Sequence, residues 1–134
     1  MKQRHFRSFI KKKQESFFYY EGSLIYNILK KQIKEHNTIY QWRRNYVRKN
    51  KSNVCPTLTA NMGTGGHNVP LIKDRYGIRK LTPRECIRFQ GFPDTFKLPK
   101  IARSHLYKQI GNSVSVPVIK RIAKEMKKCL KNGQ

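Results

Sequence analysis

Residues 79–93, RKLTPRECIRFQGFP, carry the clearest structural signal in the chain. Thr82 is a good helix N-cap, Pro83 suits the first helical position, and Glu85 stands where it completes a capping box. Gly91 is placed to end the helix in the left-handed conformation. The stretch therefore predicts a short capped helix followed by a turn, and the rest of the chain is organised around this corner.

The residues before this corner predict one helix and then β structure. Apolar residues recur at helical spacing from Ser23 to Glu35, with lysines between them. Residues 38–81 are rich in β-formers, and the strands expected there are Thr38–Trp42, Val54–Ala60 and a hairpin of Val69–Ile72 with Ile78–Leu81. Three glycines within residues 63–66 indicate either a flexible turn or a binding loop.

The residues after the corner predict two helices. The first runs from about Ser104 to Gly111, and Pro117 opens the second. One side of the second helix is apolar and the other is basic; the apolar residues are Ile119, Ile122, Ala123, Met126 and Leu130. Taken alone, this pattern is also that of an ordinary core helix. The simplest interpretation is that the apolar side docks on a larger structure.

The composition narrows the class of protein. The chain has 134 residues, with 30 Lys plus Arg against 7 Asp plus Glu and a net charge of +23. Such an excess makes nucleic acid the first partner to consider, the alternative being a cell whose proteins are generally rich in lysine. No apolar run approaches the roughly 20 residues of a membrane span. Cys55, Cys86 and Cys129 are odd in number and far apart, so we expect reduced thiols, no metal site and a cytoplasmic protein.

Several stretches together resemble one enzyme family. Residues 79–93 look like the ninth conserved motif of bacterial DNA cytosine-5 methyltransferases, and residues 109–117, QIGNSVSVP, look like the tenth. Residues 40–66 are similar to the target-recognition region of one branch of these enzymes. The match spans about residues 38–126 in the order that the family would give.

The resemblance implies an α+β fold and only part of an enzyme. It predicts a small target-recognition domain with short strands and a capped helix, plus a C-terminal helix that would dock on a missing Rossmann-like methyltransferase domain. The family's Pro-Cys nucleophile, its Glu-Asn-Val stretch and its Phe-x-Gly-x-Gly cofactor loop are absent from the sequence. The chain thus resembles the C-terminal third of such an enzyme: one half of a split methyltransferase, a frameshifted remnant or an engineered piece.

The resemblance also suggests a division and a set of site residues. Residues 1–37 would be a basic helical lead-in, 38–103 the recognition region with the ninth motif, and 104–134 the tenth motif and docking helix. No catalytic residue is expected. The DNA-binding candidates are Arg43, Arg44, Arg48, Thr57, Leu58, Thr59 and Asn61.

Each candidate carries an alternative role. The three arginines suit guanine edges in the major groove or, alternatively, phosphates. Thr57 suits a phosphate or base-edge contact, or else is a buried strand residue. The residues expected to act in structure are Thr82, Pro83, Arg84, Glu85 and Gly91. In the family, the turn with Asn112 and Ser113 returns to the large domain and would help to hold S-adenosylmethionine.

The function expected from the resemblance is target recognition for a cytosine-5 methyltransferase of a restriction–modification system or a phage. Its partners would be double-stranded DNA and an N-terminal methyltransferase chain. The alternatives are a stand-alone basic DNA-binding protein and an inactive remnant of a methyltransferase gene.

Overall fold

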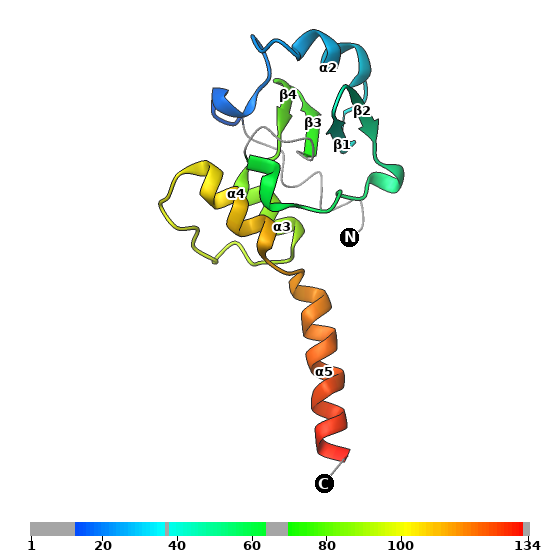
Figure 1. Cartoon of the computed structure of the whole chain (residues 1–134), viewed down its shortest axis with the longest axis vertical. Helices are drawn as coiled ribbons and strands as arrows, with labels where there is room; N and C mark the ends of the chain where they lie inside the picture. Colours follow the sequence, from blue (N-terminus) through cyan, green and yellow to red (C-terminus); the bar gives the residue numbers. More distant parts are fainter. Residues whose placement is uncertain (1–12, 37, 64–69, 133–134) are drawn as a thin grey trace.

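The computed structural model describes residues 13–36, 38–63 and 70–132, and its centre is an antiparallel sheet in the order β2-β1-β3-β4 (Figure 1). The strands are β1 (Tyr40–Arg43), β2 (Tyr46–Lys49), β3 (Pro70–Asp74) and β4 (Gly77–Lys80). The helices are α2 (Tyr26–Gln32), α3 (Pro83–Phe89), α4 (Arg103–Asn112), α5 (Val116–Asn132) and the 3-10 helices η1 (Ser16–Phe18), η2 (Lys51–Asn53) and η3 (Ala60–Gly63). Helices α3 and α4 lie between the sheet and α5 (Figure 1). The α+β class predicted from the sequence is confirmed.

The hairpin predicted around residues 73–77 is present as β3 and β4. Pairing continues to Asp74 and Gly77, so the turn contains only Arg75 and Tyr76 rather than the five residues expected. The Asp74 carboxylate shapes the turn, because its Oδ1 accepts hydrogen bonds from the amides of Tyr76 (2.8 Å) and Gly77 (3.1 Å). Of the predicted strand Val69–Ile72, Val69 lies outside the described residues.

The other β predictions meet a mixed outcome. The strand expected at Thr38–Trp42 is confirmed as β1, which pairs with β2 as a second hairpin. The strand expected at Val54–Ala60 is wrong, because residues 54–59 adopt no regular structure and η3 begins at residue 60. Residues 54–59 join neither of the outer edges of the sheet, β2 and β4. The glycine cluster lies largely outside the described residues.

The N-terminal segment contributes to the same core. Helix α2 is shorter than the predicted Ser23–Glu35, and it buries Leu29 while Ile33 is buried just after its end. Leu24 lies before the helix and is fully exposed. The aromatic run before it lies along β4: Phe18 is buried, and the Tyr20 amide donates to the Ile78 carbonyl at 2.9 Å.

The corner at α3 forms as the sequence predicts. The Glu85 amide donates to Thr82 Oγ1 at 3.2 Å, and the Thr82 amide donates to Glu85 Oε2 at 2.7 Å, which is a complete capping box. Gly91 has φ 86° and its amide donates to the Arg88 carbonyl, so it ends the helix in the left-handed region. Arg84 extends to the following loop, where it donates to the Phe96 carbonyl at 2.8 Å.

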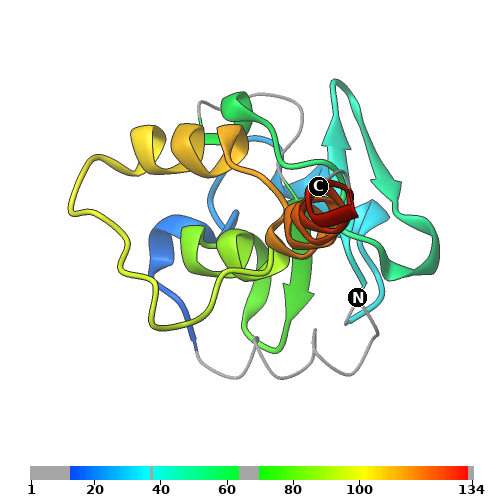
Figure 2. The ribbon, with the colours of Figure 1, turned by 90° about the horizontal axis from the view of Figure 1, so that it is seen from below.

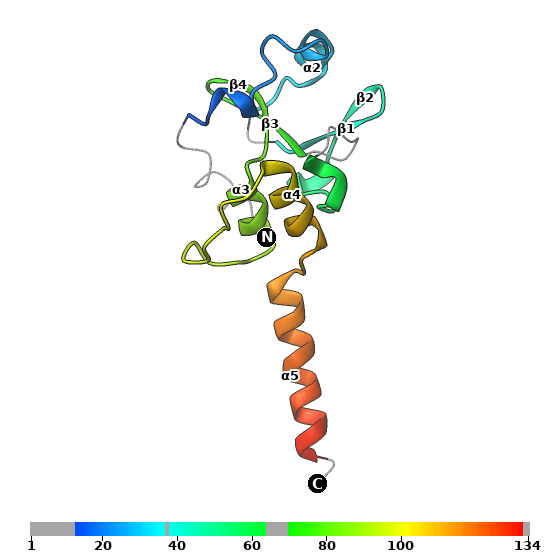
Figure 3. The same cartoon turned by 60° about the vertical axis from the view of Figure 1, so that its left-hand side comes forward.

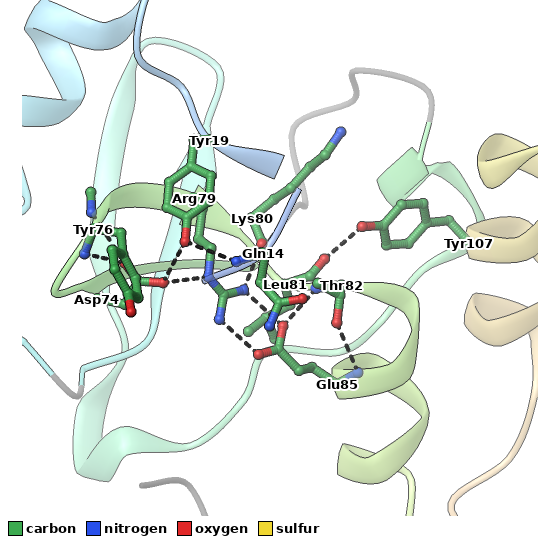
Figure 4. Close-up of polar contacts among 11 residues, drawn as sticks. Gln14, Tyr19, Asp74, Tyr76, Arg79, Lys80, Leu81, Thr82, Glu85 and Tyr107 are labelled. Carbon is green, nitrogen blue, oxygen red and sulfur yellow. Dashed lines mark hydrogen bonds and ion pairs between the residues drawn. The ribbon is translucent and has the colours of Figure 1, made fainter. Parts of the chain in front are cut away.

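A buried ion network joins this corner to the sheet (Figure 4). Arg79 on β4 has no exposed surface; its Nε donates to Asp74 Oδ2 at 2.7 Å, and its two terminal nitrogens donate to the Glu85 carboxylate at 2.8 and 2.7 Å. Tyr19 donates to Asp74 Oδ2 at 3.1 Å. Desolvation by itself would lower the pKa of Arg79, but the hydrogen bonds and charges of Glu85 and Asp74 outweigh it and raise that pKa.

Helix α4 packs against η3 (Figure 2). The two elements approach so closely that only glycine fits at two positions. A Cβ on Gly111 would lie 2.2 Å from the Thr59 carbonyl carbon, and a Cβ on Gly63 would lie 2.5 Å from Tyr107 Cβ. Tyr107 also donates its hydroxyl to the Leu81 carbonyl at 2.6 Å. Helix α4 is therefore fixed both to residues 59–63 and to the end of β4.

We predict that Glu85→Ala destabilises the chain by about 3–5 kcal/mol, because it leaves the buried Arg79 charge half compensated and also removes the capping box. Urea unfolding of the chain measures this loss. The control is Glu35→Ala, which breaks an exposed ion pair with Lys49 and should leave the free energy of unfolding nearly unchanged. Equal losses in the two variants would contradict the prediction.

We also predict that Gly111→Ala lowers the free energy of unfolding by about 1–3 kcal/mol, although alanine normally favours a helix over glycine. The cause is the overlap of the new methyl group with the backbone at Thr59. Lys108→Ala at an exposed position of the same helix is the control and should change little. Greater stability in Gly111→Ala would show that the close approach is not required.

Candidate nucleic-acid interface

A cleft of about 520 Å³ lies between the β1–β2 hairpin and the irregular segment that follows β2. The polar residues that line it are Gln41, Arg43, Arg48, Asn50, Lys51, Thr57 and Thr59, joined by Val54, Cys55 and Pro56. Residues from two strands and from the segment 50–59 thus meet at one surface.

Strand alternation explains why polar side chains face this cleft. Trp42 and Val47 face the core, and they are directly paired across the hairpin. The residues on either side of them point the opposite way, which brings Gln41 and Arg48, also a cross-strand pair, into the cleft. Arg43 Nε donates to Gln41 Oε1 at 3.2 Å, so one side chain orients the next.

The N-terminal helix holds this hairpin in place. Gln32 at the end of α2 accepts a hydrogen bond from the Val47 amide at 2.7 Å, and Glu35 pairs with Lys49. The Tyr40 hydroxyl accepts from the Glu35 amide at 3.1 Å. Residues 32–35 therefore hold the side of the hairpin that faces away from the cleft. The side chains that line the cleft take no part in these contacts.

The cleft is positively charged and contains no acidic residue among its lining side chains. Within the described part of the chain, neither Arg43 nor Arg48 forms an ion pair. Six carboxylates form ion pairs with basic residues other than these two: Glu15, Glu35, Asp74, Glu85, Asp94 and Glu125. The cleft thus favours a ligand that is anionic or rich in hydrogen-bond acceptors.

Two buried polar atoms at this cleft lack a hydrogen-bond partner in the described residues: Asn50 Oδ1 and Thr59 Oγ1. Asn50 is only 8% exposed, and its Nδ2 donates to the Val54 carbonyl at 2.9 Å, which fixes the orientation of the amide. A buried polar group without a partner costs roughly 1–3 kcal/mol. This cost falls on residues of the candidate site rather than elsewhere in the described fold.

The structure separates the predicted DNA-binding residues into groups. Arg43, Arg48, Thr57 and Thr59 line the cleft. Arg44 lies in the turn of the hairpin with φ 49°, and it is exposed. Leu58 is buried in the core, and Asn61 is exposed on η3.

Sequence reasoning missed Gln41, Asn50 and Lys51 as cleft residues. Residues 46–50 have no regular alternation of apolar and polar side chains, so the sequence gives little signal for the second strand, which is evident only from the pairing of β1 with β2. That strand places Arg48 and Asn50 on one side.

The turn with Asn112 and Ser113 lies at the other end of α4. Ser113 Oγ is within hydrogen-bond distance of Gln90 Oε1 and lies 2.7 Å from the Ile110 carbonyl. Gln90 Nε2 donates to the same carbonyl at 2.7 Å, and the Gln90 carbonyl accepts from the Val116 amide at 2.8 Å. Ser113 therefore helps to join α3, α4 and the start of α5, whereas the Asn112 side chain is exposed.

Helix α5 projects from the rest of the molecule as a single rod (Figure 3). Every residue from 117 to 131 is exposed. The exposed residues include a stripe of large apolar side chains on one side of the helix, which we call the α5 stripe: Val118, Ile119, Ile122, Met126 and Leu130. The expected apolar stripe is thus present, and it is uncovered.

Burial lowers the reactivity of two of the three cysteines, Cys55 and Cys86. Burial raises the pKa of Cys55 to about 12, and burial also raises the pKa of Cys86 well above its usual value. Both thiols therefore stay protonated and weakly nucleophilic near neutral pH. Among the described residues no group of His, Cys, Asp and Glu is placed to bind a metal, and no helix is long and apolar enough to cross a membrane.

Comparison with known proteins gives matches to one family. The Type II methyltransferase M.Bsp6I of Bacillus sp. (strain RFL6) is 62% identical over 120 residues, which are 89% of this chain and 38% of that protein. M.NlaX of Neisseria lactamica is 42% identical over 74 residues, 55% of this chain and 23% of that protein. M.HpaII of Haemophilus parainfluenzae is 49% identical over 59 residues, 44% of this chain and 16% of that protein.

The chain spans less than two fifths of the length of each of these relatives. No solved structure matches the chain. The family model described as C-5 cytosine-specific DNA methylase matches residues 2–128. These matches agree with the charged cleft and with the capped corner at α3. The chain belongs to the C-5 cytosine-specific DNA methylase family.

Proposed function

We propose that this chain is the target-recognition and domain-closing C-terminal part of a DNA cytosine-5 methyltransferase, and that it acts on double-stranded DNA together with a catalytic part. The observation that carries the proposal is the uncovered α5 stripe in a chain that matches 38% of the length of its relative M.Bsp6I. A stripe of large apolar side chains on a helix is stabilised when another surface covers it. A catalytic domain of the same enzyme is the cover that fits this family.

The division of chemistry supports this role. Methylation of cytosine at C5 needs a base flipped out of the duplex and a thiolate that attacks C6. This chain has no Pro-Cys pair, and its Cys55 and Cys86 thiols are held protonated by burial. Its own contribution is the arginine-lined cleft, which would hold the DNA in register while the flipped base occupies the other part.

The turn after α4 bears on the cofactor. S-adenosylmethionine, when bound, would supply the methyl group. The exposed Asn112 side chain has no hydrogen bond within the described chain and suits a polar group of such a ligand. Ser113 is already engaged by Gln90 and the Ile110 carbonyl, so its role would be to position Asn112 rather than to bind.

A stand-alone DNA-binding protein is the second candidate. It is favoured by the cleft, because Arg43, Arg48 and the other lining residues all belong to this chain and need no second chain to be assembled. The two proposals differ in what covers the α5 stripe and in whether the chain takes part in methyl transfer.

We predict that the 134-residue chain alone transfers no methyl group from labelled S-adenosylmethionine to DNA. We also predict activity for a version of M.Bsp6I in which the 120 matching residues are replaced by those of this chain. Label incorporation into duplex DNA measures both. Incorporation by the chain alone, or an inactive but folded chimera, would contradict the proposal.

We predict that Ile122→Asp on the α5 stripe leaves the thermal unfolding of the isolated chain unchanged, since this side chain is exposed. In the chimera the same change should lower methyl transfer at least ten-fold, because a charge would enter a covered apolar contact. Lys124→Ala on the basic side of α5 is the matched control and should keep activity. Equal activity of the two variants would contradict the proposal that the catalytic part covers the α5 stripe.

A further inference from the structure

The cleft selects its ligand by more than positive charge, because its side chains also require a particular arrangement of hydrogen-bond donors and acceptors. The Arg48 side chain has no ion pair or hydrogen bond within the described residues, so its whole guanidinium group is available. A guanidinium donates only, and it fits two acceptors side by side. Of the two atoms left without a partner at the cleft, the Thr59 hydroxyl can donate or accept, but Asn50 Oδ1 is the reverse of the guanidinium: it only accepts and needs a donor.

A phosphate satisfies only half of this demand. Its oxygens would accept from Arg48, but it carries no proton to donate to Asn50 Oδ1 and would place negative charge beside it. The major-groove edge of a G·C base pair presents both kinds of group together: guanine O6 and N7 are acceptors, and the N4 amino group of cytosine is a donor. The pattern of donors and acceptors in the cleft is complementary to that edge.

The spacing of the two side chains agrees with this reading. Arg48 lies in β2 and Asn50 follows two residues later, with its amide still bonded to the Ile39 carbonyl at 3.0 Å. Alternate residues of an extended chain lie on one side, at a rise of about 3.3 Å per residue. The Arg48 guanidinium and the Asn50 side-chain oxygen thus belong to neighbouring positions on one side of the extended backbone that continues β2.

We propose that the cleft reads one G·C base pair of the DNA target, with Arg48 donating to guanine O6 and N7 and Asn50 Oδ1 accepting from the cytosine amino group. Arg43, oriented by Gln41, stands beside Arg48 as a second cation. This inference rests on the proposed function, because it assigns the base-reading residues of that same site.

The unbound cleft must widen for Asn50 to take part, since Asn50 Oδ1 is shielded from solvent. The turn beside it contains one residue in an unfavourable backbone conformation. Ser52 has φ 53° in the left-handed region, which is unfavourable for serine. The turn is closed by the hydrogen bonds from the Val54 amide to the Lys51 carbonyl (3.2 Å) and from Asn50 Nδ2 to the Val54 carbonyl (2.9 Å).

Arg44 provides the contrast within the same hairpin. It lies in the turn and does not line the cleft. Arg44 is therefore assigned a phosphate contact, which adds affinity without sequence preference. Arg48 and Arg44, both suggested by the sequence, are thus assigned different roles, base reading and phosphate contact. One experiment distinguishes these roles.

The experiment selects duplexes from a random pool with the 134-residue chain and compares the enriched sequences for the wild type and three variants. Arg48→Lys keeps the charge but loses the fork. Asn50→Ala removes the acceptor. Arg44→Asn is the matched control, because asparagine tolerates the left-handed backbone of that position. Affinity is then measured against salt for each protein with the enriched duplex.

The wild type should enrich a G·C pair at one fixed position. Arg48→Lys should lose the preference for guanine there, with a fall in affinity of about ten-fold and an unchanged salt slope. Asn50→Ala should retain the guanine preference and relax the choice of its partner base. Arg44→Asn should bind all sequences more weakly, lower the salt slope by about one and keep the preference.

Substitutions in the DNA test the same contacts with the protein unchanged. At the enriched pair, 7-deazaguanine should weaken the wild type and leave Arg48→Lys unaffected, and 2-pyrimidinone, which lacks the amino group, should weaken the wild type but not Asn50→Ala. A preference that survives Arg48→Lys and 7-deazaguanine would overturn this inference while leaving the proposed function in place. Salt-dependent binding without any enriched sequence would overturn the recognition role itself.

Discussion

The guanidinium of Arg79, buried between the carboxylates of Asp74 and Glu85, is the interaction on which the rest of the structure depends. Asp74 shapes the β3–β4 turn and accepts from Tyr19, and Glu85 caps α3. One cation therefore fixes the N-terminal segment, a hairpin and a helix with respect to one another. Buried charges of this kind contribute little net stability, but they allow few alternative arrangements, because each wrong packing would leave a charge without a partner.

The sequence predicts this region well because its signals are local. Thr82, Glu85 and Gly91 act on backbone groups within a few residues, so their spacing alone is informative. The network itself was not predictable in the same way, since an arginine in a strand reads as a solvated residue until its partners are placed. The strand expected at residues 54–60 failed for a related reason: β-formers make a strand only when the tertiary fold pairs them with another strand, and residues 54–59 instead form a wall of the cleft.

The candidate site was predictable in its residue types and less so in its geometry. The resemblance pointed to Arg43, Arg48, Thr57 and Thr59, which do meet at one cleft. It did not single out Asn50, because an asparagine after a strand is ordinarily a turn residue. Its importance follows from an unpaired oxygen, and such a property exists only when the surrounding atoms are placed.

The contact of Gly111 with the backbone at Thr59 has a consequence for how this protein can change over evolutionary time. Thr59 belongs to the wall of the cleft, and Gly111 stands one residue before Asn112. A new wall segment, acquired by recombination with a relative, is accepted only if its main chain follows the same path across α4. Side chains of the wall can thus diversify freely, whereas insertions and deletions next to residue 59 are excluded unless the helix changes with them.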